Sequence, residues 1–193
     1  MSGDRRGCVP SQTIGPFFHF ALTTNAALGC LARPEAMGER IRVEFQLLDG
    51  DGAPVVDGMV EIWQADASGR YNHPADTQEQ VPDAAFCGFG RLATDAEGRC
   101  AFDTVRPGRV PDGRGNCQAS HLNVTVFARG LLAHLRTRVY FDGDPALAED
   151  PVLSLVPEGR RDTLLARRDS SRSSQWNFTI RLQGENETVF FDL

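Results

Sequence analysis

Residues 120–129 hold the most restrictive pattern in the sequence, because apolar and polar side chains alternate there almost throughout. Successive side chains of a β-strand point to opposite faces of the sheet. One face of such a strand would carry Leu122, Val124 and Val126. The other face would carry His121, Asn123, Thr125 and Phe127. The pattern predicts a β-strand with one face in an apolar core and a mostly polar opposite face.

His121 and Asn123 lie two positions apart on this predicted strand. Their Cα atoms are therefore expected about 6.5–7 Å apart, with both side chains on the same face. This is the spacing of a His-x-His metal clamp, in which two imidazoles from one strand bind a single ion. The neutral amide of asparagine is a poor ligand for a transition metal. The strand thus has the layout of a metal-binding strand but only half of its ligands.

Further short segments with the same alternation are separated by turns rich in Gly and Asp. Strands are expected at residues 41–47, 55–64, 90–94, 99–103, 134–141, 163–168 and 176–182, with a last strand that ends at Phe191. No long amphipathic helix pattern is present. Residues 23–39 are expected to form a loop or a short helix, and residues 144–163 one or two short helices. About eight short strands with long loops predict one all-β domain over residues 1–193, a β-sandwich with an N-terminal arm at residues 1–22.

The composition excludes several classes of partner. The 193 residues carry a net charge of −6, whereas nucleic acids and anionic membranes need a basic face. No apolar run reaches the length of a membrane span, and the first residues lack the apolar segment of a signal peptide. The five cysteines are scattered and form no Cys-x-x-Cys pair, which favours reduced thiols and a cytoplasmic location.

The chain has only two tyrosines, Tyr71 and Tyr140, and four histidines. A mononuclear ferric site with two phenolates and two imidazoles needs these residue types, since phenolate is an anionic oxygen donor that suits Fe(III). Such a centre acts as a Lewis acid, which binds a catechol as its dianion and prepares it for attack by O₂.

Three segments resemble the metal-binding parts of the intradiol ring-cleavage dioxygenases. Residues 60–71, which end at Tyr71, are similar to the strand and turn that deliver the first tyrosine ligand of that family. Residues 107–111 resemble the loop of the second tyrosine, and residues 120–123, Ser-His-Leu-Asn, resemble the His-x-His strand. The resemblance runs from Ser11 to the C-terminus and also includes residues 11–16, 127–130 and 183–193.

The resemblance places the first tyrosine ligand at Tyr71 and the first histidine ligand at His121, and both residues are kept. It places the second tyrosine at Val110 and the second histidine at Asn123, where both ligands are lost. The family's arginine three residues before the first ligand histidine falls on Gln118. These vestigial positions imply a chain that binds no iron, with Tyr71 and His121 in structural, hydrogen-bonded roles. Tyr140 is expected in a different site because of its strand neighbours.

The resemblance also implies a partner, a homologous beta subunit that holds Fe(III) in a hetero-oligomer of several αβ units. The arm of the iron-free chain would pack on that partner, with Phe17 and Phe18 as anchors, and would complete its substrate pocket. The pocket-lining positions are Thr13, Ile14, Gly15, Pro16 and Arg129. A guanidinium would give a substrate carboxylate a counter-charge, and a hydroxyl and a backbone N–H would orient it. The sequence alone also fits Arg129 as an ordinary surface arginine, and the arm as a cover for the core.

The expected function is intradiol cleavage of a small aromatic ring by O₂, with this chain as the subunit that holds no iron. Two alternatives stay open at this point. One is a self-sufficient intradiol dioxygenase with an altered metal site. The other is a non-enzymatic β-sandwich that serves as a scaffold or binding module, in which case the arm and Arg129 have no partner pocket to line.

Overall fold

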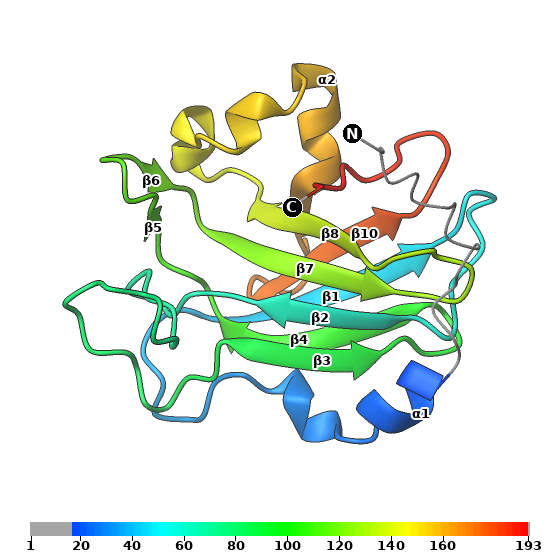
Figure 1. The fold of residues 1–193 in the computed structure, drawn as a ribbon, viewed down its shortest axis with the longest axis horizontal. Helices are drawn as coiled ribbons and strands as arrows, with labels where there is room; N and C mark the ends of the chain where they lie inside the picture. The colour runs from blue at the N-terminus through cyan, green and yellow to red at the C-terminus, as the bar shows by residue number, and fades with distance from the viewer. Residues whose placement is uncertain (1–16, 193) are drawn as a thin grey trace, which may run out of the picture.

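Strands account for most of the regular structure in the computed structural model, which describes residues 17–192 (Figure 1). The strands are β1 (Arg40–Leu48), β2 (Met59–Trp63), β3 (Phe89–Ala93), β4 (Arg99–Val105), β5 (Val110–Pro111), β6 (Cys117–Gln118), β7 (His121–Phe127), β8 (Leu135–Phe141), β9 (Leu165–Arg168) and β10 (Gln175–Arg181). The helices are short: α1 (Phe17–Leu22), η1 (Ala26–Gly29), η2 (Pro145–Glu149), η3 (Leu153–Leu155), α2 (Glu158–Arg161) and η4 (Asp162–Leu164). None of these helices in residues 17–192 has the length and apolar character needed to cross a bilayer.

Eight strands form one mixed sheet in the order β3-β2-β7-β8-β9-β10-β1-β4. Most neighbours are antiparallel, whereas β1 with β10 and β8 with β9 are parallel. The sheet is strongly curved, so that the edge strands β3 and β4 approach each other and the sheet is nearly closed (Figure 1). The all-β prediction with about eight strands is confirmed. Its two halves are joined through the short parallel pairing of β8 with β9.

The core fills the space between the two halves of the sheet. Val43 and Phe45 from β1 and Val60 and Ile62 from β2 belong to the same buried cluster. Phe45 also packs edge-on against the ring of Phe102 on β4, with ring centroids 5.7 Å apart. The two halves therefore bury one common apolar interior, which is the main source of stability in a fold of this kind.

The central strand β7 has the predicted alternation. Leu122, Val124 and Val126 are buried in the core, whereas the alternate residues Asn123 and Thr125 are only half-buried. The strand lies between β2 and β8, with Asn123 opposite Trp63 on one side and Arg138 on the other. This register brings the outer faces of three strands together at the beginning of β7.

The helical segment between β8 and β9 covers the top of the sheet in Figure 1. Its η2, η3, α2 and η4 helices occur within residues 144–163, where short helices are expected. They enclose a second apolar cluster that includes Tyr140, Leu153 and Leu164. This cluster packs beneath the first residues of β7.

Two details of the strand prediction are wrong. The segment after Gly184 forms no strand before Phe191, because it makes separate contacts with β8 and no continuous ladder. Among these contacts, the Phe191 N–H donates to the Arg136 carbonyl over 2.8 Å. The strand expected over residues 55–64 begins only at Met59. Before it, the chain is turned at Gly58, whose N–H donates to the Thr94 hydroxyl over 2.9 Å.

Candidate functional site

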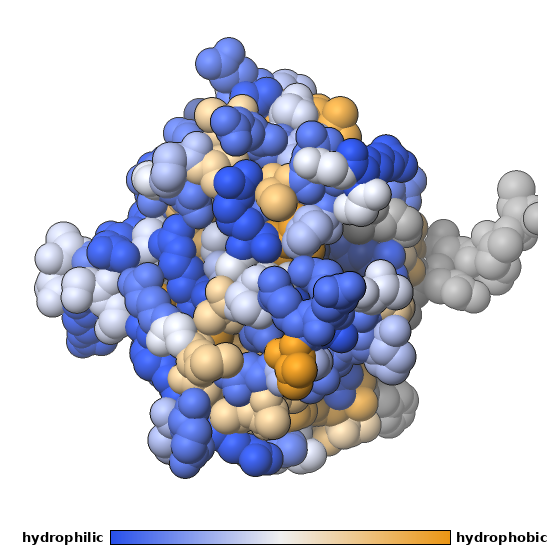
Figure 2. Space-filling model, turned by 90° about the vertical axis from the view of Figure 1, so that its left-hand side faces the viewer, coloured by the Kyte–Doolittle hydropathy of each residue, from blue (hydrophilic) through white to orange (hydrophobic). Residues whose placement is uncertain are grey.

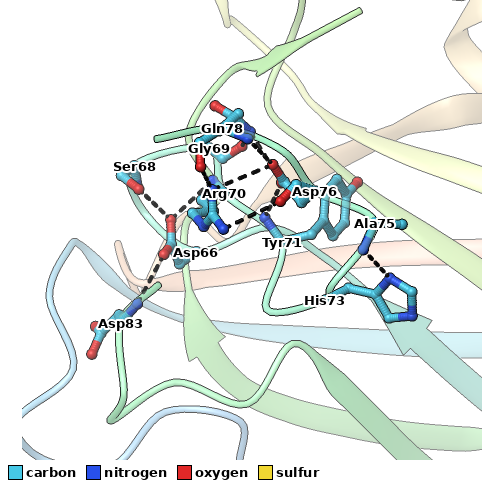
Figure 3. Close-up of polar contacts among 10 residues, drawn as sticks. All are labelled: Asp66, Ser68, Gly69, Arg70, Tyr71, His73, Ala75, Asp76, Gln78 and Asp83. Carbon is cyan, nitrogen blue, oxygen red and sulfur yellow. Dashed lines mark hydrogen bonds and ion pairs between the residues drawn. The ribbon is translucent and has the colours of Figure 1, made fainter. Parts of the chain in front are cut away.

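The loop after β2 is organised by the carboxylate of Asp66, which is buried (Figure 3). Its Oδ1 atom accepts hydrogen bonds from the Ser68 N–H over 2.8 Å, from the Ser68 hydroxyl over 2.6 Å and from the Arg70 N–H over 3.1 Å. Its Oδ2 atom accepts from the Asp83 N–H over 3.2 Å. One carboxylate therefore ties the end of this long loop to its beginning, in the way that Asp commonly fixes turns.

A second carboxylate, that of Asp76, fixes the backbone at Tyr71 (Figure 3). Asp76 Oδ2 accepts a hydrogen bond from the Tyr71 N–H over 2.8 Å, and the side-chain amide of Gln78 donates to the same oxygen over 3.0 Å. The Arg70 guanidinium lies 3.6 Å from the other oxygen of Asp76. These contacts fix the backbone from which the Tyr71 side chain extends.

Gly69 allows this loop to lie directly against the loop before β5. It adopts a φ of 87°, and a Cβ atom there would lie 2.0 Å from the Arg109 carbonyl oxygen. The neighbouring Gly108 donates its N–H to the Asp66 carbonyl over 2.9 Å. Only glycine fits both the positive φ and the close approach. The contact brings Tyr71 and Val110 to the same side of the molecule.

The Tyr71 side chain lies between β2 and the beginning of β7. Its ring stacks on Trp63, with centroids 5.7 Å apart and an angle of 16° between the planes. Its hydroxyl accepts a hydrogen bond from Asn123 Nδ2 over 3.0 Å and lies 3.4 Å from His121 Nε2. Burial raises the pKa of Tyr71 above its ordinary value, although the Asn123 hydrogen bond acts in the opposite direction. Tyr71 is therefore a neutral phenol at pH 7.

His121 is buried, with 1% of its surface exposed. Its Nδ1 atom lies 2.7 Å from the Ala119 carbonyl, which can only accept, so Nδ1 carries the proton and Nε2 faces Tyr71 with a lone pair. Burial, together with the positive charge of Arg138, lowers the pKa of His121 to about 4. The imidazole is neutral at pH 7 and accepts from the Tyr71 hydroxyl.

The fully buried carboxylate of Asp150 supports His121 from behind. Its Oδ2 atom accepts from the Ala119 N–H over 2.7 Å, and Oδ1 accepts from the N–H groups of Val152 and Leu153 over 2.9 and 2.7 Å. The Tyr140 hydroxyl donates to the same Oδ1 atom over 3.1 Å. No role was predicted for Asp150, which lies within residues 144–163, where only short helices were expected.

Tyr140 belongs to this supporting network, as expected, and not to the group around Tyr71. It lies opposite His121 in the β7–β8 ladder, and the two rings have centroids 5.9 Å apart. Burial raises the pKa of Tyr140, and its hydroxyl is directed to Asp150. The second phenol of the chain therefore acts as a hydrogen-bond donor in the interior.

Val110 and Gln118 lie opposite each other in the small β5–β6 pair. The Gln118 side-chain oxygen accepts a hydrogen bond from Arg138 Nη1 over 2.6 Å. No role was predicted for Arg138, which the β7–β8 ladder places opposite Asn123. The guanidinium adds a positive charge next to Tyr71 and His121.

The residues at the four vestigial ligand positions do not fit a ferric ion. Tyr71 and His121 meet at the site, but Val110 offers no donor atom. Asn123 directs its Nδ2 atom to the Tyr71 hydroxyl and to the Trp63 carbonyl, so the N–H side of the amide, which offers no lone pair to a metal, faces the Tyr71 oxygen. In residues 17–192, no group of three or more His, Cys, Asp and Glu side chains is placed to hold a metal ion.

A pocket of about 600 Å³ opens in front of this group. Its lining includes Trp63, Tyr71, His73, Asp76, Val110 and Gln118. Figure 2 views the molecule from the same end and shows a mainly hydrophilic surface, on which apolar residues form small, separate groups. The pocket is therefore open to water, and its floor is closed by hydrogen bonds between protein groups.

Arg129 lies at the opposite end of β7 from His121 (Figure 1). Its Nε atom forms an ion pair with Asp57 Oδ2, and 63% of its side chain is exposed. The structure therefore separates Arg129 from the Tyr71 and His121 group. Thr13, Ile14, Gly15 and Pro16 lie outside the described residues, as does most of the arm predicted over residues 1–22.

Comparison with known proteins identifies relatives over nearly the whole chain. A family model described as "Dioxygenase" matches residues 14–184. The protocatechuate 3,4-dioxygenase alpha chain of Burkholderia cepacia is 43% identical over 95% of this chain and 96% of its own length. The beta chain of the same enzyme from that organism is 38% identical over 92% of this chain and 77% of its own length.

A solved structure agrees with the fold. The intradiol ring-cleavage dioxygenase of Tetranychus urticae superimposes with a TM-score of 0.62, and the match covers 83% of this chain and 90% of that chain at 20% identity. The family match, the full-length relatives and the shared fold lead to the same assignment. The chain belongs to the intradiol dioxygenase family and, within it, is similar along nearly its whole length to a protocatechuate 3,4-dioxygenase alpha chain.

Proposed function

We propose that this chain is the alpha subunit of a protocatechuate 3,4-dioxygenase, and that a homologous beta subunit binds the Fe(III) of the complex. Similarity to an alpha chain over 95% of this chain supports the assignment. The beta chain is itself a relative, so both subunits would share one fold. The four free cysteines in the described part of the chain are consistent with action in the reducing cytoplasm.

The observation that carries the proposal is the hydrogen bond from Asn123 Nδ2 to the Tyr71 hydroxyl. An iron-binding chain needs a lone pair at that position, and this chain presents an N–H donor instead. Together with Val110, this leaves two retained donors, Tyr71 and His121, which are too few to hold iron against water and cellular competitors. A subunit that does not carry the iron needs an intact fold but no complete set of ligands, and this chain has that combination.

In the proposed complex, protocatechuate reacts with O₂, the ring opens between the two hydroxylated carbons, and both oxygen atoms enter the product, 3-carboxy-cis,cis-muconate. The iron of the beta subunit supplies Lewis-acid chemistry to the catechol. The contribution of this chain is to shape the mouth of the partner's pocket. Thr13, Ile14, Gly15, Pro16 and Arg129 line it, and the arm over residues 1–22 packs on the partner.

The position of Arg129 supports a role in the partner's pocket. A strand rises about 3.4 Å per residue, so β7 places roughly 20 Å between the His121 and Phe127 ends. Arg129 follows Phe127 and is thus far from the pocket of its own chain. An exposed guanidinium at this end can meet a carboxylate held by another subunit, which matches the acidic group of protocatechuate.

Co-expression of a tagged copy of this chain with an untagged beta chain tests the proposal. We expect the beta chain to co-purify, iron to be present in proportion to the beta chain, and O₂ uptake to begin on addition of protocatechuate. Iron and activity in the chain purified alone would favour a self-sufficient dioxygenase. A stable chain that ignores the beta chain would favour a scaffold or binding module.

A further inference from the structure

The pairing of β2 with β7 brings the turn that holds Asp57 close to Arg129. Met59 at the start of β2 lies across from Phe127 at the end of β7. Asp57 lies two residues before β2 and Arg129 two residues after β7, so both belong to turns at the same end of this strand pair. Their opposite charges attract each other, and the two side chains form an ion pair.

The contact is made at one edge of the guanidinium. Asp57 Oδ2 pairs with Arg129 Nε, and the Asp57 side chain is only 27% exposed whereas that of Arg129 is 63% exposed. A guanidinium carries five N–H donors in a rigid, planar fork. A carboxylate at the Nε edge leaves donors at the terminal end of this fork, where a second anion can bind. The less exposed Asp57 thus holds the Nε edge of the more exposed guanidinium.

The pairing of Asp57 with Arg129 Nε matters because an exposed arginine side chain has many rotamers. Holding a long side chain in one geometry costs conformational entropy each time that a ligand binds. A fixed carboxylate on the neighbouring loop removes part of that cost beforehand, which is the general advantage of preorganisation. Asp57 can act in this way because it lies next to β2, whose first residue Met59 is fully buried.

We propose that Asp57 is a positioning residue, which holds Arg129 by Nε so that its terminal fork meets a carboxylate in the partner's pocket. The inference rests on the proposed function, because it requires Arg129 to act in trans. Asp57 itself touches no substrate in this scheme. Its contribution is to orient the guanidinium. The effect on substrate binding should therefore depend on the length and charge of the side chain at position 57.

Steady-state kinetics of the assembled αβ complex test this inference. We expect Asp57→Asn to raise the KM for protocatechuate by about fivefold, the scale of one surface ion pair, with iron content and assembly unchanged. Asp57→Glu should restore most of the wild-type KM. The double variant Asp57→Asn/Arg129→Ala should be no worse than Arg129→Ala alone, because Asp57 would act only through Arg129.

Arg42 and Asp103 provide the matched control. They form another cross-strand Arg–Asp pair on the surface, over 2.8 Å between β1 and β4. Asp103→Asn should leave KM and kcat unchanged. Wild-type kinetics of Asp57→Asn, or additive effects in the double variant, would overturn the positioning role while Arg129→Ala remained impaired. Wild-type kinetics of Arg129→Ala would instead remove Arg129 from the partner's pocket, and the inference with it.

Discussion

Arg138 on β8 donates a hydrogen bond from Nη1 to the side-chain oxygen of Gln118 on β6, over 2.6 Å. Gln118 stands where the family resemblance places an arginine, so the guanidinium reaches this spot from another strand. Its charge lies beside two of the vestigial ligand positions, Tyr71 and His121. The group around Tyr71 and His121 thus has a cationic neighbour, which β8 supplies.

The chain purified without a beta chain should contain no stoichiometric iron. Val110 stands where a phenolate is expected, and Asn123 stands where an imidazole is expected. Fe(III) would therefore have too few ligands. Metal analysis and the visible absorption spectrum measure this directly. The variant Val110→Tyr/Asn123→His restores the donor types and serves as the positive comparison. An iron-replete wild-type chain with a tyrosinate-to-Fe(III) charge-transfer colour would contradict the prediction.

Assembly should depend on apolar residues of the arm and of α1. Phe18 packs near Phe127, with ring centroids 6.4 Å apart, and the Phe20 side chain is 72% exposed. Stable interfaces bury such residues, so Phe20→Ser should reduce the yield of co-purified beta chain. Leu155→Ser is the control, because Leu155 is also strongly exposed, at 80%, but lies in η3. Light scattering should show a defined hetero-oligomer for the control and loss of it for Phe20→Ser. Equal assembly of both would exclude α1 from the interface.

Arg129→Ala should impair catalysis without affecting assembly or iron content. Loss of a charge-assisted hydrogen bond should lower kcat/KM for protocatechuate by about 1.5–3 kcal/mol. Catechol has no carboxylate, so its kcat/KM should fall less if the guanidinium binds that group. Equal losses for the two substrates would place Arg129 near the iron, and unchanged kinetics with an intact complex would return it to the surface.

The stability of the protein should fall below pH 6.5 because of His121. Its pKa is about 4 in the folded chain, compared with about 6.5 in an unfolded chain. The unfolded state therefore binds more protons between these values, and the free energy of unfolding decreases as the pH falls, by about 3 kcal/mol at most. Above pH 6.5 this contribution is complete. Thermal unfolding of wild type and of His121→Gln, in the same assembly, measures this effect. Between pH 4 and 6.5 the melting temperature of wild type should fall more steeply with decreasing pH than that of the variant. Parallel profiles would argue against a neutral buried His121.

Replacement of Asp150 should be strongly destabilising. Its buried carboxylate accepts from the N–H groups of Ala119, Val152 and Leu153 and from the Tyr140 hydroxyl. Asp150→Ala leaves these donors without partners, at an expected loss of about 3 kcal/mol in unfolding free energy. Asp162→Asn is the control, because the Asp162 side chain is 81% exposed. It should change the unfolding free energy by less than about 0.5 kcal/mol. Similar melting temperatures for the two variants would show that Asp150 has no such structural role.

The strands were predictable because alternation is a local signal. The core face of β7 follows from Leu122, Val124 and Val126 alone, and the resemblance brought Tyr71 and His121 together correctly. The curvature that nearly closes the sheet was not predictable, because it depends on β3 and β4 meeting across the fold. The strand predicted to end at Phe191 does not form, because that segment makes only isolated contacts with β8.

The supporting network around the site was harder to find. Arg138 and Gln118 are separated by twenty residues in the chain, and nothing in either local pattern pairs them. Asp150 acts through a loop that reaches back to Ala119, thirty-one residues earlier. Such partners are set by tertiary packing, so a single sequence shows the residue types without showing which of them meet.

The carboxylates of Asp66 and Asp76 hold the Tyr71 loop through hydrogen bonds to its own backbone. In many metal sites, binding and folding are coupled, so that loss of one ligand unravels the loops that carry the others. Val110 and Asn123 take no part in these two carboxylate networks, so a change at either position should leave the loop backbone in place. The loop can therefore keep its shape whichever residues stand at the two positions beside it.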